Sequence, residues 1–192
     1  MITLDLRPTL TLTDEQFAQI CQNNRDLRFE RTAKGELVIM APTGGETCSL
    51  NLSLGSQLWQ WNQIHKLGKG FDSSTGFKLP NGSTRSPDVA WVRLERWNAL
   101  TPEQQRRFVP LCPDFAIELK SPSDDLADLQ TKMQEYLENG LQLGWLIAPE
   151  TQQVEIYRPN QAVEILNHPK MLLGEGLLPG FVLDLTADTS QM

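Results

Sequence analysis

Two acidic residues and one lysine occupy positions that suggest metal-assisted chemistry. Asp88 follows Pro87 at the start of the apolar run DVAWV. Glu118 and Lys120 end another apolar run, DFAIELK, and would share one face of a strand because side chains alternate across it. Apolar sequence on both sides favours a central strand, where a buried acid and ammonium cost several kcal/mol unless each is paired or bound to a metal.

A divalent cation is the ligand that these residue types favour. Mg²⁺ binds oxygen ligands and usually takes only one or two protein carboxylates, with water and phosphate completing its shell. We therefore predict that Asp88 and Glu118, on neighbouring strands, are metal ligands for Mg²⁺ or Mn²⁺. Lys120 would reach the same space, where it could position an attacking water or stabilise charge that develops on a phosphate.

Glu46 is a further candidate because it stands at the start of a long predicted helix. Its helical spacing from the leucines that follow places it on the line that should pack against the sheet. The run from Thr43 to Glu46 also fits a capping box, in which the acid binds the N-cap amide. Asp88 can likewise mark a strand entry, and Glu118 with Lys120 can form an ion pair of little energetic value. The combination of the acids and the lysine favours a shared site.

The hydrophobic pattern of the first half predicts two helices and two pairs of strands. A short helix begins at the N-cap Thr13, and LRFERT and ELVIMA form a hairpin around the turn AKG. A long helix follows PTGG and ends at Gly68, with leucines at helical spacing on its apolar face. GFKLP and SPDVAWV are predicted strands joined by a tight turn at Asn81-Gly82.

The second half continues this alternation of helices and strands. A helix with Thr101 as its N-cap precedes the strand DFAIELK, and a second helix, capped by Ser123, ends before Gly140. LGWLIAP and QQVEIYRP form a hairpin that AVEIL can extend, and LPGFVLDL is a last strand. The whole pattern predicts an α/β (α+β) domain with a mixed sheet flanked by helices.

Length and charge limit the class of protein. The chain has 192 residues, of which 40% are hydrophobic and 21% charged, as in a globular domain with a core. Its net charge of -7 argues against a protein whose whole surface attracts nucleic acid. Arginines that flank the region between Asp88 and Glu118 form either a local DNA-facing patch or a solvated face. Its members are Arg85, Arg93, Arg96, Arg106 and Arg107.

Cysteine and histidine usage favours a reducing compartment and oxygen ligands. The 3 cysteines are scattered and the 2 histidines are far apart, so no zinc spacing and no disulfide framework is visible. The N-terminal residues show no basic region followed by an apolar run, and no stretch approaches the ~18 apolar residues that span a bilayer. We therefore predict a cytoplasmic protein without a membrane partner.

The candidate residues resemble the motif of the PD-(D/E)XK nuclease superfamily. Pro87-Asp88 supplies the PD, and Glu118 to Lys120 supplies the ExK. The wider blocks RFERTAKGELVIMAPTGGE, LPNGSTRSPDVAWV, IELKSPSDDLADLQTKMQEYLENGLQLGWLI, VEIYRP and LPGFVLDL resemble, in this order, the Uma-family restriction endonucleases. The resemblance covers roughly Asp14 to Leu185.

The resemblance implies Mg²⁺-dependent hydrolysis of DNA phosphodiester bonds by a restriction-endonuclease-like fold. Asp88 and Glu118 would be metal ligands, and Lys120 the catalytic base or electrostatic helper. Glu46 would be the helix-borne acid that many superfamily members add to the site. Two departures stand out: many relatives have a histidine at the start of the long helix, where Thr47 follows Glu46, and many have an aliphatic residue in place of Lys120.

The resemblance also implies the domain organisation and the partners. Residues 1–192 would form a single domain, with an N-terminal helix and β-hairpin at about 13–42 and a core at about 43–186. DNA would be the partner, and cleavage of both strands would favour a homodimer.

Two alternative functions stay open at this point. The acidic charge favours a non-catalytic module of the same fold that binds DNA or a protein. The tryptophans could serve as base-stacking platforms, but their positions on helices and strands favour contacts in the core or in a dimer. A structural role in an assembly, with the tryptophans at a dimer interface, is the other alternative. On the helix after the site, Tyr136 is expected to pack in the core and Lys132 to be solvated.

Overall fold

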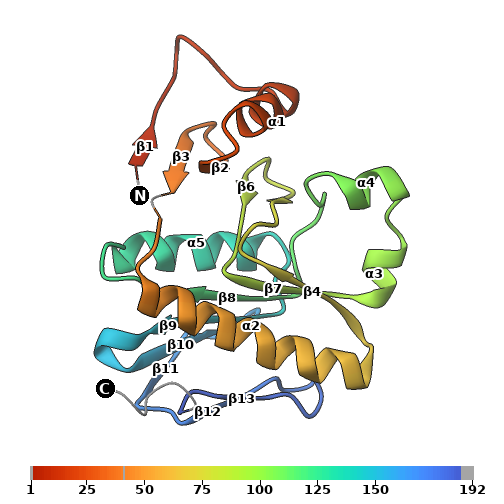
Figure 1. Cartoon of the computed structure of the whole chain (residues 1–192), viewed down its shortest axis with the longest axis vertical. Helices are drawn as coiled ribbons and strands as arrows, with labels where there is room; N and C mark the ends of the chain where they lie inside the picture. The colour runs from red at the N-terminus through yellow and green to blue at the C-terminus, as the bar shows by residue number, and fades with distance from the viewer. Residues whose placement is uncertain (1, 41, 187–192) are drawn as a thin grey trace.

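The central element is a six-stranded mixed sheet with the order β11-β10-β9-β8-β7-β4 (Figure 1). The computed structural model describes residues 2–40 and 42–186. β8 and β9 are parallel, and the other neighbours in this sheet are antiparallel. The strands are β4 (Gly68–Asp72), β7 (Val89–Arg93), β8 (Phe115–Leu119), β9 (Leu143–Ala148), β10 (Gln153–Tyr157) and β11 (Glu164–Asn167). The mixed sheet and the central position of β8 confirm the prediction.

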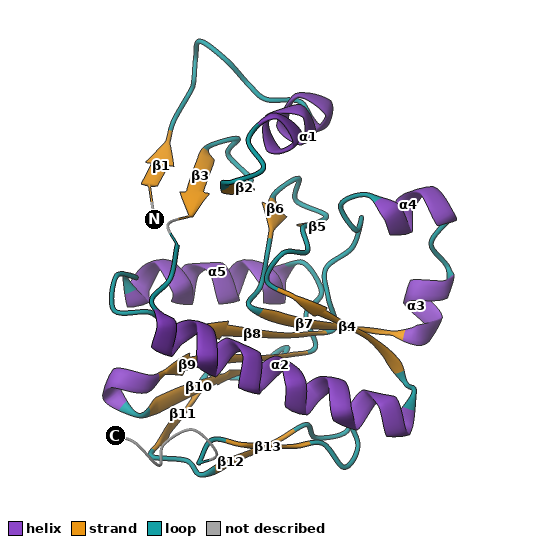
Figure 2. Ribbon diagram, in the orientation of Figure 1, coloured by secondary structure: helices purple, strands orange, loops and turns teal. Residues whose placement is uncertain are grey.

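Two helices cover opposite faces of this sheet, as Figure 2 shows. Helix α2 (Gly45–His65) packs its buried leucines on the side of β7 and β8 that carries Val89 and Ile117. Helix α5 (Leu126–Glu138) packs on the other side, against Ala90 and Ala116. The alternation of side chains along β7 and β8 thus divides the core into two layers. Glu118, two residues after Ala116, belongs to the α5 side.

A second sheet lies at the N-terminal end, with the order β1-β3-β2-β6-β5. It consists of β1 (Ile2–Leu4), β2 (Arg28–Arg31), β3 (Leu37–Met40), β5 (Phe77–Lys78) and β6 (Thr84–Arg85), and α1 (Asp14–Asn23) packs beside it. The predicted helix and the predicted β2–β3 hairpin are both confirmed, and Thr13 caps α1 through a capping box. β1 and β4 have no counterpart in the prediction.

The prediction of a hairpin that joins GFKLP directly to SPDVAWV was wrong. The Asn81-Gly82 turn joins β5 to β6, with Gly82 at a φ of 89° that favours glycine, and β7 belongs to the other sheet. The chain passes from one sheet to the other at Ser86-Pro87, where proline cannot donate a ladder hydrogen bond. This crossing brings Asp88 to the border between the two sheets.

The helix caps explain two further differences from the prediction. Asp125, not Ser123, is the N-cap of α5, and its side chain accepts a hydrogen bond from Ala127 N. Gly44 is the N-cap of α2 without a side-chain hydrogen bond, so Thr43 and Glu46 form no capping box. Thr101 caps α4 (Pro102–Arg106) as predicted.

The remaining elements lie at the edges of the fold. The short helix α3 (Leu94–Asn98) follows β7, and a 3-10 turn at Pro149–Thr151 joins β9 to β10. β12 (Met171–Leu173) pairs with β13 (Val182–Asp184), the predicted last strand. Within the part of the chain that the structure describes, no helix combines the length and apolar character needed to cross a membrane.

Candidate functional site

Asp88 and Glu118 lie side by side at the ends of neighbouring strands. Val89 pairs with Ile117 in the antiparallel β7–β8 register, so Asp88, just before Val89, lies opposite Glu118, just after Ile117. The backbone N–H of Leu119 donates to Asp88 Oδ2 at 2.8 Å. The structure therefore brings together the two acids that the sequence predicted as one site.

A buried lysine from α5 completes this cluster. The Lys132 ammonium lies 2.9 Å from Glu118 Oε1 and 2.8 Å from Glu30 Oε1, where Glu30 comes from β2 of the N-terminal sheet. Tyr136, one turn further along α5, donates its hydroxyl to Glu118 Oε1 at 2.9 Å. The expectation that Lys132 is solvated was wrong, because its position beside the apolar stripe of α5 buries it. Tyr136 packs in the core as predicted and also binds Glu118.

A second cation holds Glu30 from the other side. Arg85 Nη1 lies 3.1 Å from Glu30 Oε2, and its Nε donates to Glu135 on α5. Ser86 N also donates to Glu30 Oε1 at 2.8 Å. Strand β2, strand β6 and helix α5 are thus tied together around one buried carboxylate, which connects the N-terminal sheet to the central one.

The electrostatics of the cluster separate its carboxyl groups. Burial raises the pKa of Glu118 to about 8, with the charges of Asp88 and Glu30 adding to the effect and Lys132 opposing it. Burial also raises the pKa of Asp88. Burial opposes ionisation of Glu30 as well, but Lys132 and Arg85 lower its pKa overall. Lys132 and Arg85 therefore favour the carboxylate form of Glu30, whereas Asp88 and Glu118 need further positive charge to ionise together.

The donor set around Asp88 fits a hard divalent cation. Asn51 on α2 donates its Nδ2 to Asp88 Oδ1 at 2.9 Å. Among the described residues, the buried Oδ1 of Asn51 has no hydrogen-bond partner. Asp88, Glu118 and Asn51 thus bring together carboxylate and amide oxygens, the ligand types that Mg²⁺ and Mn²⁺ accept. Over residues 2–40 and 42–186, no group of three or more acid, histidine or cysteine side chains is arranged to hold a metal.

The other two predicted site residues are not brought to this cluster. The Lys120 ammonium lies 3.0 Å from Glu150 Oε2 and donates to the carbonyl of Ser121. Glu46 is exposed in the first turn of α2, where the buried residue is Thr47. The catalytic roles of Lys120 and Glu46 stay predictions that variants can test.

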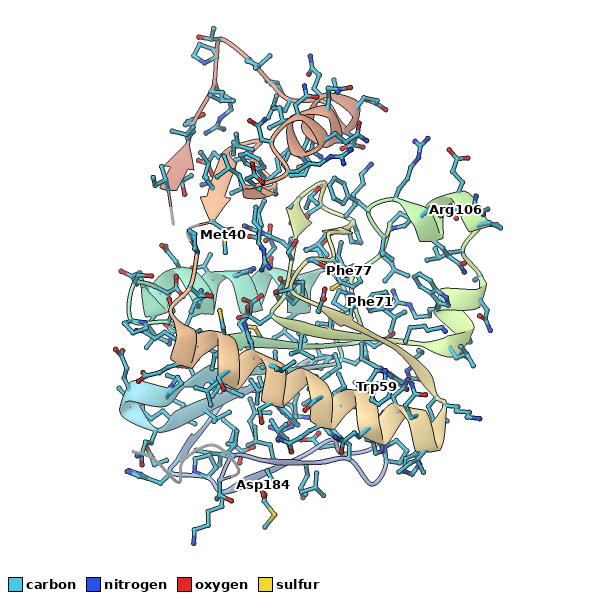
Figure 3. The ribbon with its side chains drawn as sticks, viewed as in Figure 1. Met40, Trp59, Phe71, Phe77, Arg106 and Asp184 are labelled. Atoms are coloured by element: carbon cyan, nitrogen blue, oxygen red, sulfur yellow. The ribbon has the colours of Figure 1, made fainter. Side chains whose placement is uncertain are left out.

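The arginines that flank the region between Asp88 and Glu118 are mostly engaged in ion pairs. Arg85 belongs to the buried cluster, and Arg93 and Arg96 flank the buried Asp114. Arg107 pairs with Glu103 along α4. Arg106 is exposed on α4, where Figure 3 labels it. These pairings favour a structural role over a continuous DNA-facing patch.

A cleft of about 1020 Å³ leads to the acidic cluster. The walls are formed by β2, the end of β3, β4 and the part of α2 from Cys48 to Trp59, and Glu30, Asn51 and Asp88 lie along the cleft. Figure 3 labels Met40, Trp59 and Phe71, which line it from three of these elements. A substrate in this cleft would contact the two sheets and α2 at the same time.

Sequence reasoning missed three residues of the cluster, and two of them had a detectable pattern. Lys132 falls at helical spacing between Leu129 and Tyr136, so its stem shares their face. Asn51 likewise lies on the buried line of α2. Nothing comparable marks Glu30, because its contacts depend on how the N-terminal sheet docks on α5.

The fold and the site together define a class of protein. The chain is similar to a solved structure described as a "putative nuclease belonging to DUF820" from Anabaena variabilis ATCC 29413, with a TM-score of 0.68 and 21% identity over 78% of this chain and 82% of that chain. The fold is thus that of a nuclease-like mixed α/β domain.

The family follows from the sequence match. The model of the Uma2 family, described as "Putative restriction endonuclease", matches residues 14–186, and the chain belongs to this family. No curated protein matches the chain. The predicted family and fold are both confirmed.

Proposed function

We propose that this protein is a divalent-metal-dependent endonuclease that hydrolyses phosphodiester bonds in DNA. The observation that carries the proposal is the pairing of Asp88 with Glu118 on neighbouring strands, with Glu118 buried and Asp88 lining a cleft. Membership of the Uma2 family supports nuclease chemistry. Mg²⁺ is the proposed cofactor, with Mn²⁺ as a substitute.

Asp88 and Glu118 would hold the metal, with the amide oxygen of Asn51 as a third oxygen near it. When bound, the ion would act as a Lewis acid on the scissile phosphate and lower the pKa of a bound water. The hydrogen bond from Leu119 N fixes the orientation of Asp88, and that from Tyr136 fixes Glu118. These residues thus preorganise the carboxylates, which is the contribution expected of the protein in phosphoryl transfer.

Lys132 is the cation that we assign to this site. Its ammonium lies 2.9 Å from Glu118, so it orients this ligand and keeps positive charge near the phosphate. Burial opposes the ammonium form, but the charges of Glu118 and Glu30 raise the pKa of Lys132 overall, which favours the ammonium. An electrostatic role therefore suits it better than proton abstraction.

A cleavage assay tests the proposal directly. The purified protein is incubated with supercoiled, linear duplex and single-stranded DNA, with Mg²⁺ or Mn²⁺ and with EDTA. We expect metal-dependent cleavage that Asp88→Asn and Glu118→Gln abolish. Glu150→Gln is the matched control, because Glu150 is an exposed acid that binds Lys120.

Two results would contradict the proposal. One is cleavage that persists in Asp88→Asn, which would locate the chemistry elsewhere. The other is the lack of cleavage of every DNA form together with no Mn²⁺ binding by calorimetry. The second result would favour the non-catalytic module that the acidic charge suggests.

The same cleavage assay, applied to further variants, tests the roles predicted for Lys120 and Glu46. Lys120→Met and Glu46→Gln should retain cleavage if Lys132 is the cation of the site, whereas Lys132→Met should lose it. Loss of cleavage in folded Lys120→Met would restore the role that the sequence motif assigns to Lys120.

A reducing cytoplasm is the location that we propose. Cys21, Cys48 and Cys112 are all free thiols, which supports it. A homodimer is proposed only for the case of double-strand cleavage, and light scattering with and without duplex DNA would test it.

A further inference from the structure

The cleft beside Asp88 has the wrong charge for gripping duplex DNA through its phosphates. Its lining includes the carboxylates of Asp26, Glu30, Asp72 and Asp88. Arg28 is the one basic residue among the described residues that line it, and its Nη1 already donates to Ser73 Oγ. Proteins that hold a duplex by its backbone neutralise phosphates with several Lys and Arg side chains. Affinity in this cleft must therefore come largely from contacts other than phosphate contacts.

The walls of the cleft offer large apolar side chains instead. On α2, Leu52 is 75% exposed and Trp59 is 59% exposed, and their separation of about two helical turns puts them on the same side of the helix. Leu27, at the entry to β2, is also exposed in the cleft. Figure 3 labels Trp59 on α2. An apolar wall of this kind favours a flat, hydrophobic ligand surface.

Trp59 differs from the tryptophans of the core. Trp61, Trp91 and Trp145 are buried and pack in the layer between α2 and the sheet. Trp59 leaves its ring open beside the cleft and contributes no burial to that layer. Exposure of a large aromatic side chain in a cleft that also contains a candidate catalytic acid is typical of ligand binding.

We infer that the substrate of this site is single-stranded DNA, whose unpaired bases stack on Trp59 and contact Leu52 while the backbone passes Asp88. In a duplex the faces of each base are covered by its neighbours, so only unpaired nucleotides can use such a wall. The inference rests on the proposed nuclease function and specifies its substrate class.

Fluorescence anisotropy tests this inference without relying on cleavage. The probes are a fluorescein-labelled mixed-sequence DNA strand, the same strand annealed to its complement, and an RNA strand of the same sequence, each with Ca²⁺ instead of Mg²⁺. We expect the single DNA strand to bind about tenfold more tightly than the duplex. We also expect its affinity to depend weakly on salt, since few phosphates are contacted.

Variants on α2 separate the cleft from the rest of the helix. Trp59→Ala should weaken single-strand binding about tenfold, and Trp59→Phe should retain most of it. Ile64→Ala is the matched control, because Ile64 is 79% exposed on the same helix but does not line the cleft. It should leave binding unchanged.

The outcomes distinguish this inference from the proposed function. Duplex binding as tight as single-strand binding, or equal effects of Trp59→Ala and Ile64→Ala, would overturn the inference. Tighter binding of the RNA strand would overturn the assignment to DNA. Selective binding of the single DNA strand without any metal-dependent cleavage would support the cleft assignment and contradict the nuclease. Asp88-dependent cleavage confined to duplex DNA would do the reverse.

Discussion

Lys132→Met is the substitution that most sharply tests the buried cluster. Lys132 has 7% of its side chain exposed and pairs with two carboxylates, those of Glu118 and Glu30. Methionine retains much of the apolar stem but leaves both acids without this partner. Removing one partner of a buried ion pair costs about 3–5 kcal/mol, because the remaining charge is uncompensated. We therefore expect the free energy of unfolding to fall by about 3–5 kcal/mol at pH 8.

Lys120→Met is the matched control for this substitution. Lys120 is 16% exposed in its side chain, and its partner Glu150 is 52% exposed, so solvent screens the pair. Ion pairs of this kind contribute about 0–1 kcal/mol. The contrast between the two lysines thus measures whether the buried cation of the site comes from α5 or from the end of β8.

Urea denaturation followed by circular dichroism measures both variants, with the slope of the transition checked for two-state behaviour. The loss in Lys132→Met should shrink toward pH 5, where protonation relieves the unpaired acids. The reasoning is refuted if Lys132→Met is no less stable than Lys120→Met at pH 8. It is equally refuted if Glu118→Gln fails to recover part of the loss in Lys132→Met.

Three further predictions concern the titration of Glu118, the binding of Mn²⁺ and the packing of Gly68. Burial raises the pKa of Glu118 to about 8 in the folded protein, so its contribution to the free energy of unfolding is fully present below the pKa that it has in the unfolded chain. This contribution is lost as the pH rises through about 8. Glu118→Gln should therefore flatten the decline of stability with pH, measured by thermal unfolding of the metal-free protein. Mn²⁺ should raise the melting temperature of the wild type at pH 8 and leave Asp88→Asn unchanged, which differential scanning calorimetry can measure. Gly68→Ala should lower the free energy of unfolding by several kcal/mol, because an added Cβ would lie 2.3 Å from Trp91 and from the Val92 carbonyl oxygen. Gly70→Ala on the same strand is the control, because its Cβ would meet open space. Urea denaturation should show a far smaller loss for Gly70→Ala.

The part of the fold that depends on local pattern was predictable. The apolar alternation of DFAIELK and its apolar neighbours indicated a central strand, and β8 is buried at every position. The pairing of Asp88 with Glu118 followed from placing two strands side by side. Both features depend on side-chain alternation, which the order of residues determines.

The parts that were not predictable depend on long-range docking. β5 and β6 belong to the N-terminal sheet, although the Asn81-Gly82 turn predicted a hairpin that included the strand after Asp88. Glu30 reaches Lys132 only because this second sheet lies against α5. The ExK motif placed the site lysine at Lys120, but a residue just past a strand end can turn toward solvent-side partners such as Glu150. Motif spacing thus indicated that the two acids lie together, whereas the lysine that contacts Glu118 comes from α5 and is not part of the motif.

The most direct test of the account is a crystal structure of the protein soaked with Mn²⁺, with anomalous scattering used to locate the ion. The account predicts one peak within coordination distance of both Asp88 and Glu118 that disappears in Asp88→Asn. A map without a peak at these carboxylates, or with Mn²⁺ bound only at Glu46 or Glu150, would contradict it.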